Sequence, residues 1–207
     1  MLSSCSLFRE QDIENKKIEE LVTYLQGVGE GRGRLGINNQ QHLFSFDAVL
    51  KENNDWILAA SIPMHGEEVL MLRDLKQEKI ILDERDGLEL RIVSGISEYL
   101  RSHKQSPKLA KTFILELRRM MRLVLHKQLN LKVECGKANC QLGEVIYQAE
   151  ASSKQLTLKK SLSNEYEIVL VAMNLTDSIF ERSSIFLHSK KADNSIRNLL
   201  SLELFWK

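Results

Sequence analysis

Glycine, proline and net charge are all scarce in this chain of 207 residues. It has 10 glycines and 2 prolines, which excludes a collagen-like repeat and a low-complexity polymer. Its 29 basic and 28 acidic residues leave a formal charge of +1, which excludes a strongly polycationic or polyanionic binder. Aromatic residues make up only 6%, so few rings can stack on bases and we expect no nucleic-acid partner. No apolar run is long enough to cross a bilayer, so we expect no direct membrane insertion.

Cysteine and histidine are too few and too scattered to form a recognisable site. Three cysteines, an odd and sparse set, favour a reducing, cytoplasmic location. Cys135 and Cys140 share a predicted turn, but zinc would require two further ligands, so we interpret them as incidental thiols. A reversible redox pair is the alternative. The five histidines occur without a metalloprotease or nucleophile motif, so the sequence predicts no catalytic residue, no metal and no cofactor.

Hydrophobic periodicity predicts helices near both ends of the chain and in its centre. Residues 1–10 are expected to form an N-terminal tail. Apolar residues then recur every three or four positions, and Ser106-Pro107 supplies an N-cap and a first-turn proline for a long central helix. The predicted helices cover residues 11–26, 95–103, 106–129 and, from Asp193 or Asn194 to Leu204, the C-terminus. The last segment is ambiguous, because Leu202 to Phe205 also fits an edge strand.

Short apolar or alternating runs predict strands in two groups, before and after the central helices. The predicted strands are 44–48, 56–62, 69–72, 79–82, 88–93, 131–135, 144–148, 156–160 and 165–171. Strands that are grouped apart from helices indicate the α+β class. We therefore predict one α+β domain over residues 11–207, with an antiparallel sheet of short strands, an N-terminal helix, a long central helix and a C-terminal helix.

Half of the glycines lie in one segment, from Gly27 to Gly36. It contains the pattern G-x-G-x-x-G between Gly31 and Gly36, which binds a pyrophosphate only where a strand precedes it and a helix follows. Here a predicted helix precedes it and a strand follows. We therefore predict a flexible glycine-rich loop over residues 27–41, which would be the most mobile internal stretch. Its two arginines are too few for an arginine–glycine nucleic-acid segment.

One face of the central helix is basic. At 100° per residue its cationic side chains fall within one arc, and Glu116 is the only acid between Lys108 and Lys132. One interpretation is internal, with this stripe packed beside an acidic sheet edge. The other is external, with the stripe attracting an acidic protein segment or phosphate. The candidate partner-binding residues of the stripe are Lys108, Lys111, Arg118, Arg119 and Arg122.

The C-terminus places many apolar side chains at a chain end, where chains usually fray. This segment either docks into the core or forms an apolar contact with another subunit. For the second case the candidate contact residues are Leu199, Leu202, Phe205 and Trp206.

The predicted order of elements resembles that of bacterial secretion chaperones. The opening Met1 to Arg9, the length and the run Arg118-Arg119-Met120-Met121-Arg122 are similar to the LvgA-like accessory adaptors of the Dot/Icm type IV secretion system. The resemblance implies a non-enzymatic subunit that joins the IcmS–IcmW adaptor pair on the C-terminal tail of the coupling ATPase DotL and helps to recruit effector proteins. It would then work at the cytoplasmic face of an inner-membrane complex. Type III secretion chaperones, by contrast, tend to be shorter and acidic.

The sequence therefore predicts a protein-binding adaptor or chaperone and no enzymatic activity. The alternative is a small-molecule-binding or enzymatic α+β domain, because residues far apart in a sequence can assemble a site that no local motif reveals.

Overall fold

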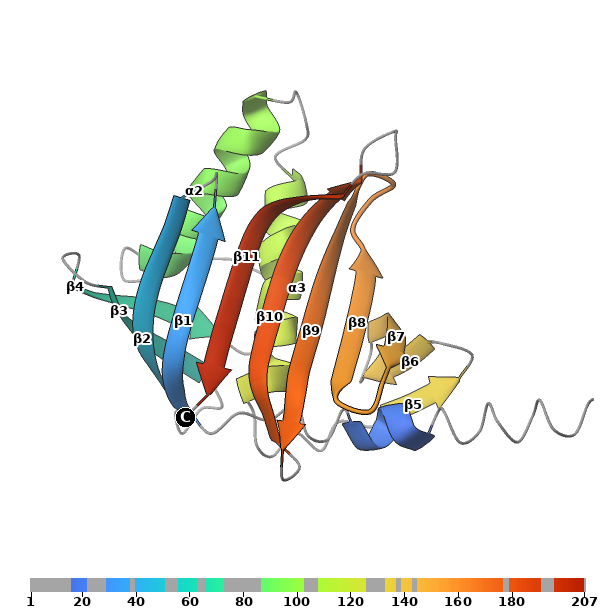
Figure 1. Ribbon diagram of the computed structural model, residues 1–207. Coiled ribbons are helices and arrows are strands. Elements are labelled where there is room, and N and C mark those ends of the chain that lie inside the picture. The colour runs from blue at the N-terminus through green and yellow to red at the C-terminus, as the bar shows by residue number, and fades with distance from the viewer. Residues whose placement is uncertain are drawn as a thin grey trace, which may run out of the picture.

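The structure is a computed structural model of the chain (Figure 1). It describes twelve stretches of the chain, and the structural statements below concern these residues. They are residues 16–21, 29–37, 40–50, 56–62, 66–72, 87–102, 108–125, 133–136, 139–142, 145–176, 179–190 and 196–206.

One antiparallel sheet of 11 strands dominates the fold. Its strands are β1 (Glu30–Ile37), β2 (Gln40–Leu50), β3 (Trp56–Ile62), β4 (Gly66–Leu72), β5 (Val133–Gly136), β6 (Asn139–Leu142), β7 (Val145–Ala151), β8 (Gln155–Ser161), β9 (Tyr166–Thr176), β10 (Ile179–Lys190) and β11 (Ile196–Trp206). Their order across the sheet is β4-β3-β2-β1-β11-β10-β9-β8-β7-β6-β5. Every strand pairs with a neighbour in sequence except at the β1–β11 contact, where the first and the last of these strands pair.

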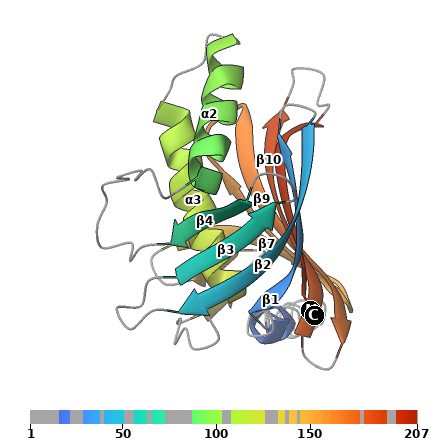
Figure 2. The same cartoon turned by 90° about the vertical axis from the view of Figure 1, so that its left-hand side faces the viewer.

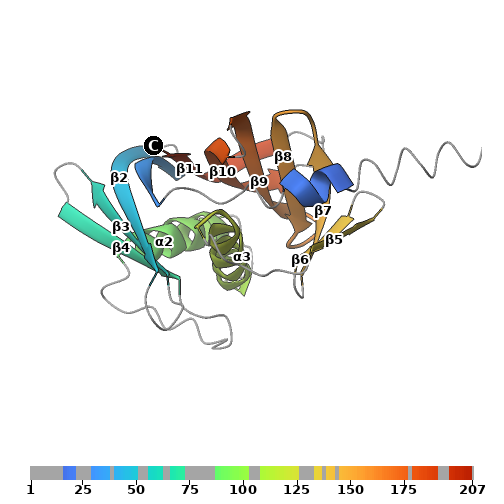
Figure 3. The ribbon, with the colours of Figure 1, turned by 90° about the horizontal axis from the view of Figure 1, so that it is seen from below.

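Two helices, α2 (Gly87–Ser102) and α3 (Lys108–Leu125), lie on one side of this sheet (Figure 2). Seen from below, the sheet curls around them (Figure 3). Helix α3 contacts the central strands β9 and β10, and α2 contacts the edge strand β4. We call the face that packs on the helices the inner face and the opposite one the outer face.

The core lies between the helices and the inner face of the sheet. Helix α3 contributes apolar side chains spaced by three or four residues, such as Phe113, Leu117 and Val124, and all are buried. The strands contribute alternate residues, which include Leu202 of β11 and Ile185 of β10. The helical segment 16–21 joins this core through Ile18 and Leu21 at the end of the sheet that carries β5 to β7.

The predicted α+β class is wrong, because the protein is mostly antiparallel sheet and its helices are short. The predicted C-terminal helix is strand β11. Apolar residues at positions 199, 200, 202 and 204 fit a helix and a strand, and pairing with β1 and β10 decides for the strand. The predicted strand 88–93 belongs to α2, where Ile92, Ile96 and Leu100 recur every four residues.

The expected flexible loop is also corrected, because residues 30–37 of its range form strand β1. This strand is paired on both sides, with β2 and β11. Gly33 lies opposite Phe44, and a Cβ at Gly33 would overlap the Phe44 ring. The missing side chain therefore makes room for an aromatic ring of the core.

Other predicted segments lie partly or wholly outside the described residues. The central helix is described as the 18 residues of α3, within the predicted range 106–129. The predicted N-terminal helix 11–26 is described only at residues 16–21, which are helical. The N-terminal tail 1–10 and the predicted strand 79–82 lie outside the described residues.

Candidate partner-binding surface

The basic residues of α3 do not form one free surface. Lys111 is exposed, whereas Arg118 is only 5% exposed and is engaged in an interaction. Arg119 is half-buried and forms an ion pair with Glu116 one turn earlier. The side chains of Lys108 and Arg122 lie outside the described residues. Arg118 and Arg119 are therefore engaged within the protein, but the acidic partner of Arg119 lies on α3 itself and not on the sheet edge that the internal interpretation expected.

Glu116 is the centre of an ionic cluster between α3 and the sheet. It is 2% exposed, and its Oε1 atom accepts hydrogen bonds from Arg119 Nη1 and from Lys160 Nζ of β8, the latter at 2.7 Å. The Lys160 Nζ atom also lies 5.9 Å from the ring centroid of Tyr147 on β7. Burial, and then the negative charge of Glu116, raise the pKa of Tyr147. This cluster connects α3 to β7 and β8.

The C-terminal segment docks into the middle of the sheet. Leu199 and Leu202 are buried in β11, between β1 and β10. The Trp206 ring contacts Phe46 edge-on at 5.3 Å between centroids, and its Nε1 atom donates a hydrogen bond to Ser183. Of the four candidate residues, three therefore contribute to the core or pack against it. The fourth, Phe205, is half-buried on the outer face, where it shares a row with arginine side chains.

The outer face carries arginine and aromatic side chains from three adjacent strands. Strand pairing places Arg32 of β1, Phe205 of β11 and Arg182 of β10 in one row. The guanidinium of Arg182 lies 5.1 Å from the centroid of the Phe205 ring. Arg182 also pairs with the buried carboxylate of Glu203, in the next row. Neither α2 nor α3 covers this face (Figure 2).

The same face exposes two large apolar side chains. Leu43 of β2 is 63% exposed and lies opposite Arg34 of β1, and Ile146 of β7 is 61% exposed. A single exposed leucine is normal on a protein surface and by itself does not indicate a binding site. Leu43 indicates one because it lies next to the row of arginine and aromatic side chains.

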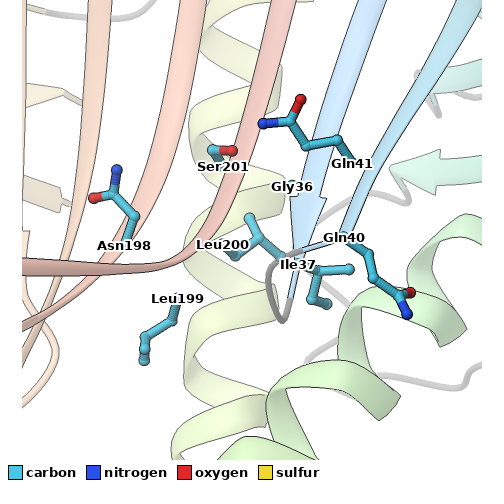
Figure 4. Close-up of a pocket in the computed structure, with 8 residues that line it drawn as sticks. All are labelled: Gly36, Ile37, Gln40, Gln41, Asn198, Leu199, Leu200 and Ser201. Atoms are coloured by element: carbon cyan, nitrogen blue, oxygen red, sulfur yellow. The ribbon is translucent and has the colours of Figure 1, made fainter.

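A hollow of about 200 Å³ opens beside the same strands (Figure 4). Its centre is Gly36 of β1, which has no side chain and lies between Gln41 and Ser201. The lining therefore offers carboxamide and hydroxyl groups and includes no acidic or basic side chain. Its residues are Gly36, Ile37, Gln40, Gln41, Asn198, Leu199, Leu200 and Ser201.

The two cysteines predicted as incidental thiols are joined. Cys135 of β5 and Cys140 of β6 lie opposite each other and form a disulfide with a Cα–Cα distance of 4.1 Å. The backbone N–H of Cys135 donates to Glu19 Oε1 at 3.0 Å, so the helical segment 16–21 is hydrogen-bonded to this hairpin.

The described part of the chain has no cluster of three or more His, Cys, Asp or Glu side chains that could hold a metal ion. Within that part, no helix has both the length and the apolar character that a bilayer crossing requires.

Comparisons with known proteins give no relative. No family model matches the chain, and neither the curated proteins nor the solved structures contain a match.

Of the outer-face residues, the sequence singled out Phe205 as a candidate and missed the arginines beside it. Arg182 and Phe186 lie on β10, which no predicted strand included, although Ile185 and Leu187 alternate with polar or aromatic neighbours. Arg32 and Arg34 fall in the segment 27–41, for which the sequence predicts a loop. Alternation between buried and exposed residues over 30–37 is weak in the sequence, because two of the buried positions are glycines.

Proposed function

We propose that this protein is a non-enzymatic adaptor or chaperone subunit that binds other proteins through the outer face of its sheet. The observation that supports the proposal most is the row of Arg32, Phe205 and Arg182 beside the exposed Leu43. Arginine and aromatic residues are enriched among the side chains that dominate protein–protein binding, and an exposed leucine adds apolar area that a partner can bury.

The partners in this proposal come from the resemblance to type IV secretion adaptors. They are the IcmS–IcmW pair, the C-terminal tail of DotL and effector proteins, at the cytoplasmic face of the inner membrane. The α+β element order that contributed to the resemblance is not present. The outer face supports protein binding in general, and the choice of these partners rests on the remaining sequence features of the resemblance. In the cytoplasm the Cys135–Cys140 disulfide would be reduced.

Complex formation tests this function directly. The full chain is mixed with the IcmS–IcmW pair and the DotL tail, and the complex is measured by size-exclusion chromatography with light scattering. Leu43→Glu places a charge where the partner would bury an apolar side chain, so we expect binding about tenfold weaker or worse. Lys111→Glu changes an exposed residue of the α3 stripe and serves as the matched surface variant.

Each outcome of this experiment is informative. If Lys111→Glu abolishes binding and Leu43→Glu does not, the interface is on α3 and the outer-face proposal is wrong. If the wild-type chain remains a monomer with every partner and captures nothing, the adaptor function itself is wrong.

We propose no second function. The enzymatic or small-molecule alternative requires convergent titratable groups in a pocket, and the residues that line the hollow beside Gly36 include none.

A further inference from the structure

The hollow beside Gly36 is lined by hydrogen-bonding groups, and an arginine lies near it on β1. Ser201 contributes a hydroxyl, and Gln41 and Asn198 contribute carboxamides (Figure 4). Arg34 lies two residues before Gly36 on the same face of β1, which is about 7 Å along a strand. All four side chains can donate hydrogen bonds, and Arg34 is always charged. The arrangement suits a negatively charged acceptor.

Arg34 has an unused donor at this position. Its Nε atom is buried and has no hydrogen-bond partner. The residue opposite it on β11 is Glu203, but the Glu203 carboxylate accepts a hydrogen bond from Arg182 on the other side. A buried donor without an acceptor is unfavourable, so a ligand in the hollow gains affinity if the Arg34 side chain turns and offers its donors to it.

The acidic side chains on the outer face near the hollow do not supply an acceptor for Arg34. Glu30 and Asp47 also lie on the outer face, but they face each other at the opposite end of β1, beyond Arg32. On this side of Arg32, the carboxylate opposite Arg34 is that of Glu203, and it is already paired with Arg182, so two guanidinium groups stand beside one carboxylate. The local charge is therefore positive, which favours an anionic ligand.

We propose that the hollow beside Gly36 binds a carboxylate side chain from an acidic segment of a partner protein, with Arg34 as its cation. This inference rests on the proposed protein-binding function. Leu43, directly opposite Arg34, is the reason to assign a peptide, because a segment with an apolar residue beside its acidic one buries this leucine. A free phosphate ion makes no such contact. Gly36 keeps the hollow open, since a Cβ there would meet Ser201 Oγ.

Binding of two matched synthetic peptides to the full chain tests the chemistry of the ligand. One short labelled peptide alternates glutamate with leucine, and the other has glutamine in place of each glutamate. We expect fluorescence anisotropy to show that the glutamate peptide binds at least about tenfold more tightly, and that added salt reduces this difference.

Variants of the chain test the location. Arg34→Gln removes the guanidinium, and we expect it to weaken binding of the glutamate peptide about tenfold. Arg34→Lys keeps the charge and loses the Nε donor, so its affinity should lie between those of Arg34→Gln and the wild type. Lys154→Gln removes an exposed positive charge from the turn between β7 and β8 and should change the affinity less than about twofold. The melting temperature of each variant shows whether it is folded.

Three results would overturn the proposal. The first is equal affinity for the two peptides, and the second is an Arg34→Gln variant that binds as the wild type does. The third is competition by inorganic phosphate as strong as that by the unlabelled peptide, which would assign the hollow to phosphate. If Arg34→Gln does not fold, the affinities of the wild type for the two peptides and the affinity of Arg34→Lys still test the proposal.

Failure of this site and failure of the adaptor function give different results. If the wild type and Arg34→Gln capture the secretion partners equally, the adaptor function stands and the hollow is not its binding site. If peptide binding depends on Arg34 but no partner complex forms, the site stands and the adaptor function is wrong.

Discussion

Alanine substitutions at the three glycines of the G-x-G-x-x-G pattern test whether β1 is a packed strand or a flexible loop. A Cβ at Gly33 would lie less than 3.0 Å from three atoms of the Phe44 ring, which is buried in the core. A Cβ at Gly31 would overlap the backbone oxygen of Phe205 on β11. At Gly36 the only close atom is the hydroxyl oxygen of Ser201, at 2.5 Å.

The expected losses of stability follow from what each neighbour can do. Phe44 must move within a packed core, and overpacking of this kind costs about 1–3 kcal/mol, so we expect about 2 kcal/mol for Gly33→Ala. The Phe205 carbonyl cannot rotate away without shifting β11, so Gly31→Ala should cost about 3 kcal/mol or more. The Ser201 hydroxyl can rotate, and alanine reduces the entropy of the unfolded chain, so Gly36→Ala should change stability by less than about 1 kcal/mol.

Urea unfolding of the three variants and the wild type, followed by far-ultraviolet circular dichroism, measures these differences. We predict that Gly36→Ala is the most stable of the three variants, Gly33→Ala the next and Gly31→Ala the least stable. The positive-φ residue among the described glycines is Gly29, so backbone strain does not contribute at these three positions. If Gly31→Ala and Gly33→Ala are as stable as Gly36→Ala, the close packing of β1 against β2 and β11 is refuted.

Three further predictions concern the rest of the fold. Glu116→Gln should lower the unfolding free energy, measured in urea, by about 2 kcal/mol, which is less than the loss of a fully buried ion pair because Lys160 is partly exposed. If the losses from Glu116→Gln and Lys160→Met simply add in the double variant, the two residues do not interact and the contact is contradicted. Tyr147 has a raised pKa, so above about pH 10 the unfolded chain loses a proton that the folded chain keeps. The unfolding free energy should therefore fall as pH rises, and fall less in Tyr147→Phe. Reduction of the disulfide that Cys135 forms with the cysteine five residues later should lower the unfolding free energy by about 2 kcal/mol. In Cys135→Ser the unfolding free energy should not change when dithiothreitol is added.

Local signals in the sequence predicted some elements closely. The predicted strand 56–62 has the same bounds as β3, and the predicted strands 144–148, 156–160 and 165–171 largely coincide with β7, β8 and β9. Ser106-Pro107 located the start of α3 to within two residues. These segments combine a clear apolar period with polar turns on both sides, so each is recognisable without its neighbours.

The misassigned segments depend on contacts between distant residues. Over 199–204 the apolar positions satisfy both a helical and a strand period, so the choice depends on pairing with β1 and β10. In β1 the buried positions Gly31 and Gly33 carry no apolar side chain, and the core is filled there by Phe44 and Phe46 from β2. No window of β1 alone contains that information, which is why the glycine content by itself predicts a flexible loop.

The candidate binding surface has the same non-local origin. Arg34 belongs to the first strand of the chain, whereas Arg182 and Glu203 belong to its last two strands, and they become neighbours only through the β1–β11 contact. The hollow beside Gly36 also requires this contact, since Ser201 and Asn198 come from β11. Both sites therefore form only when the two halves of the sheet have joined. A partner that binds there selects the completed sheet and stabilises the β1–β11 pairing by its own binding free energy.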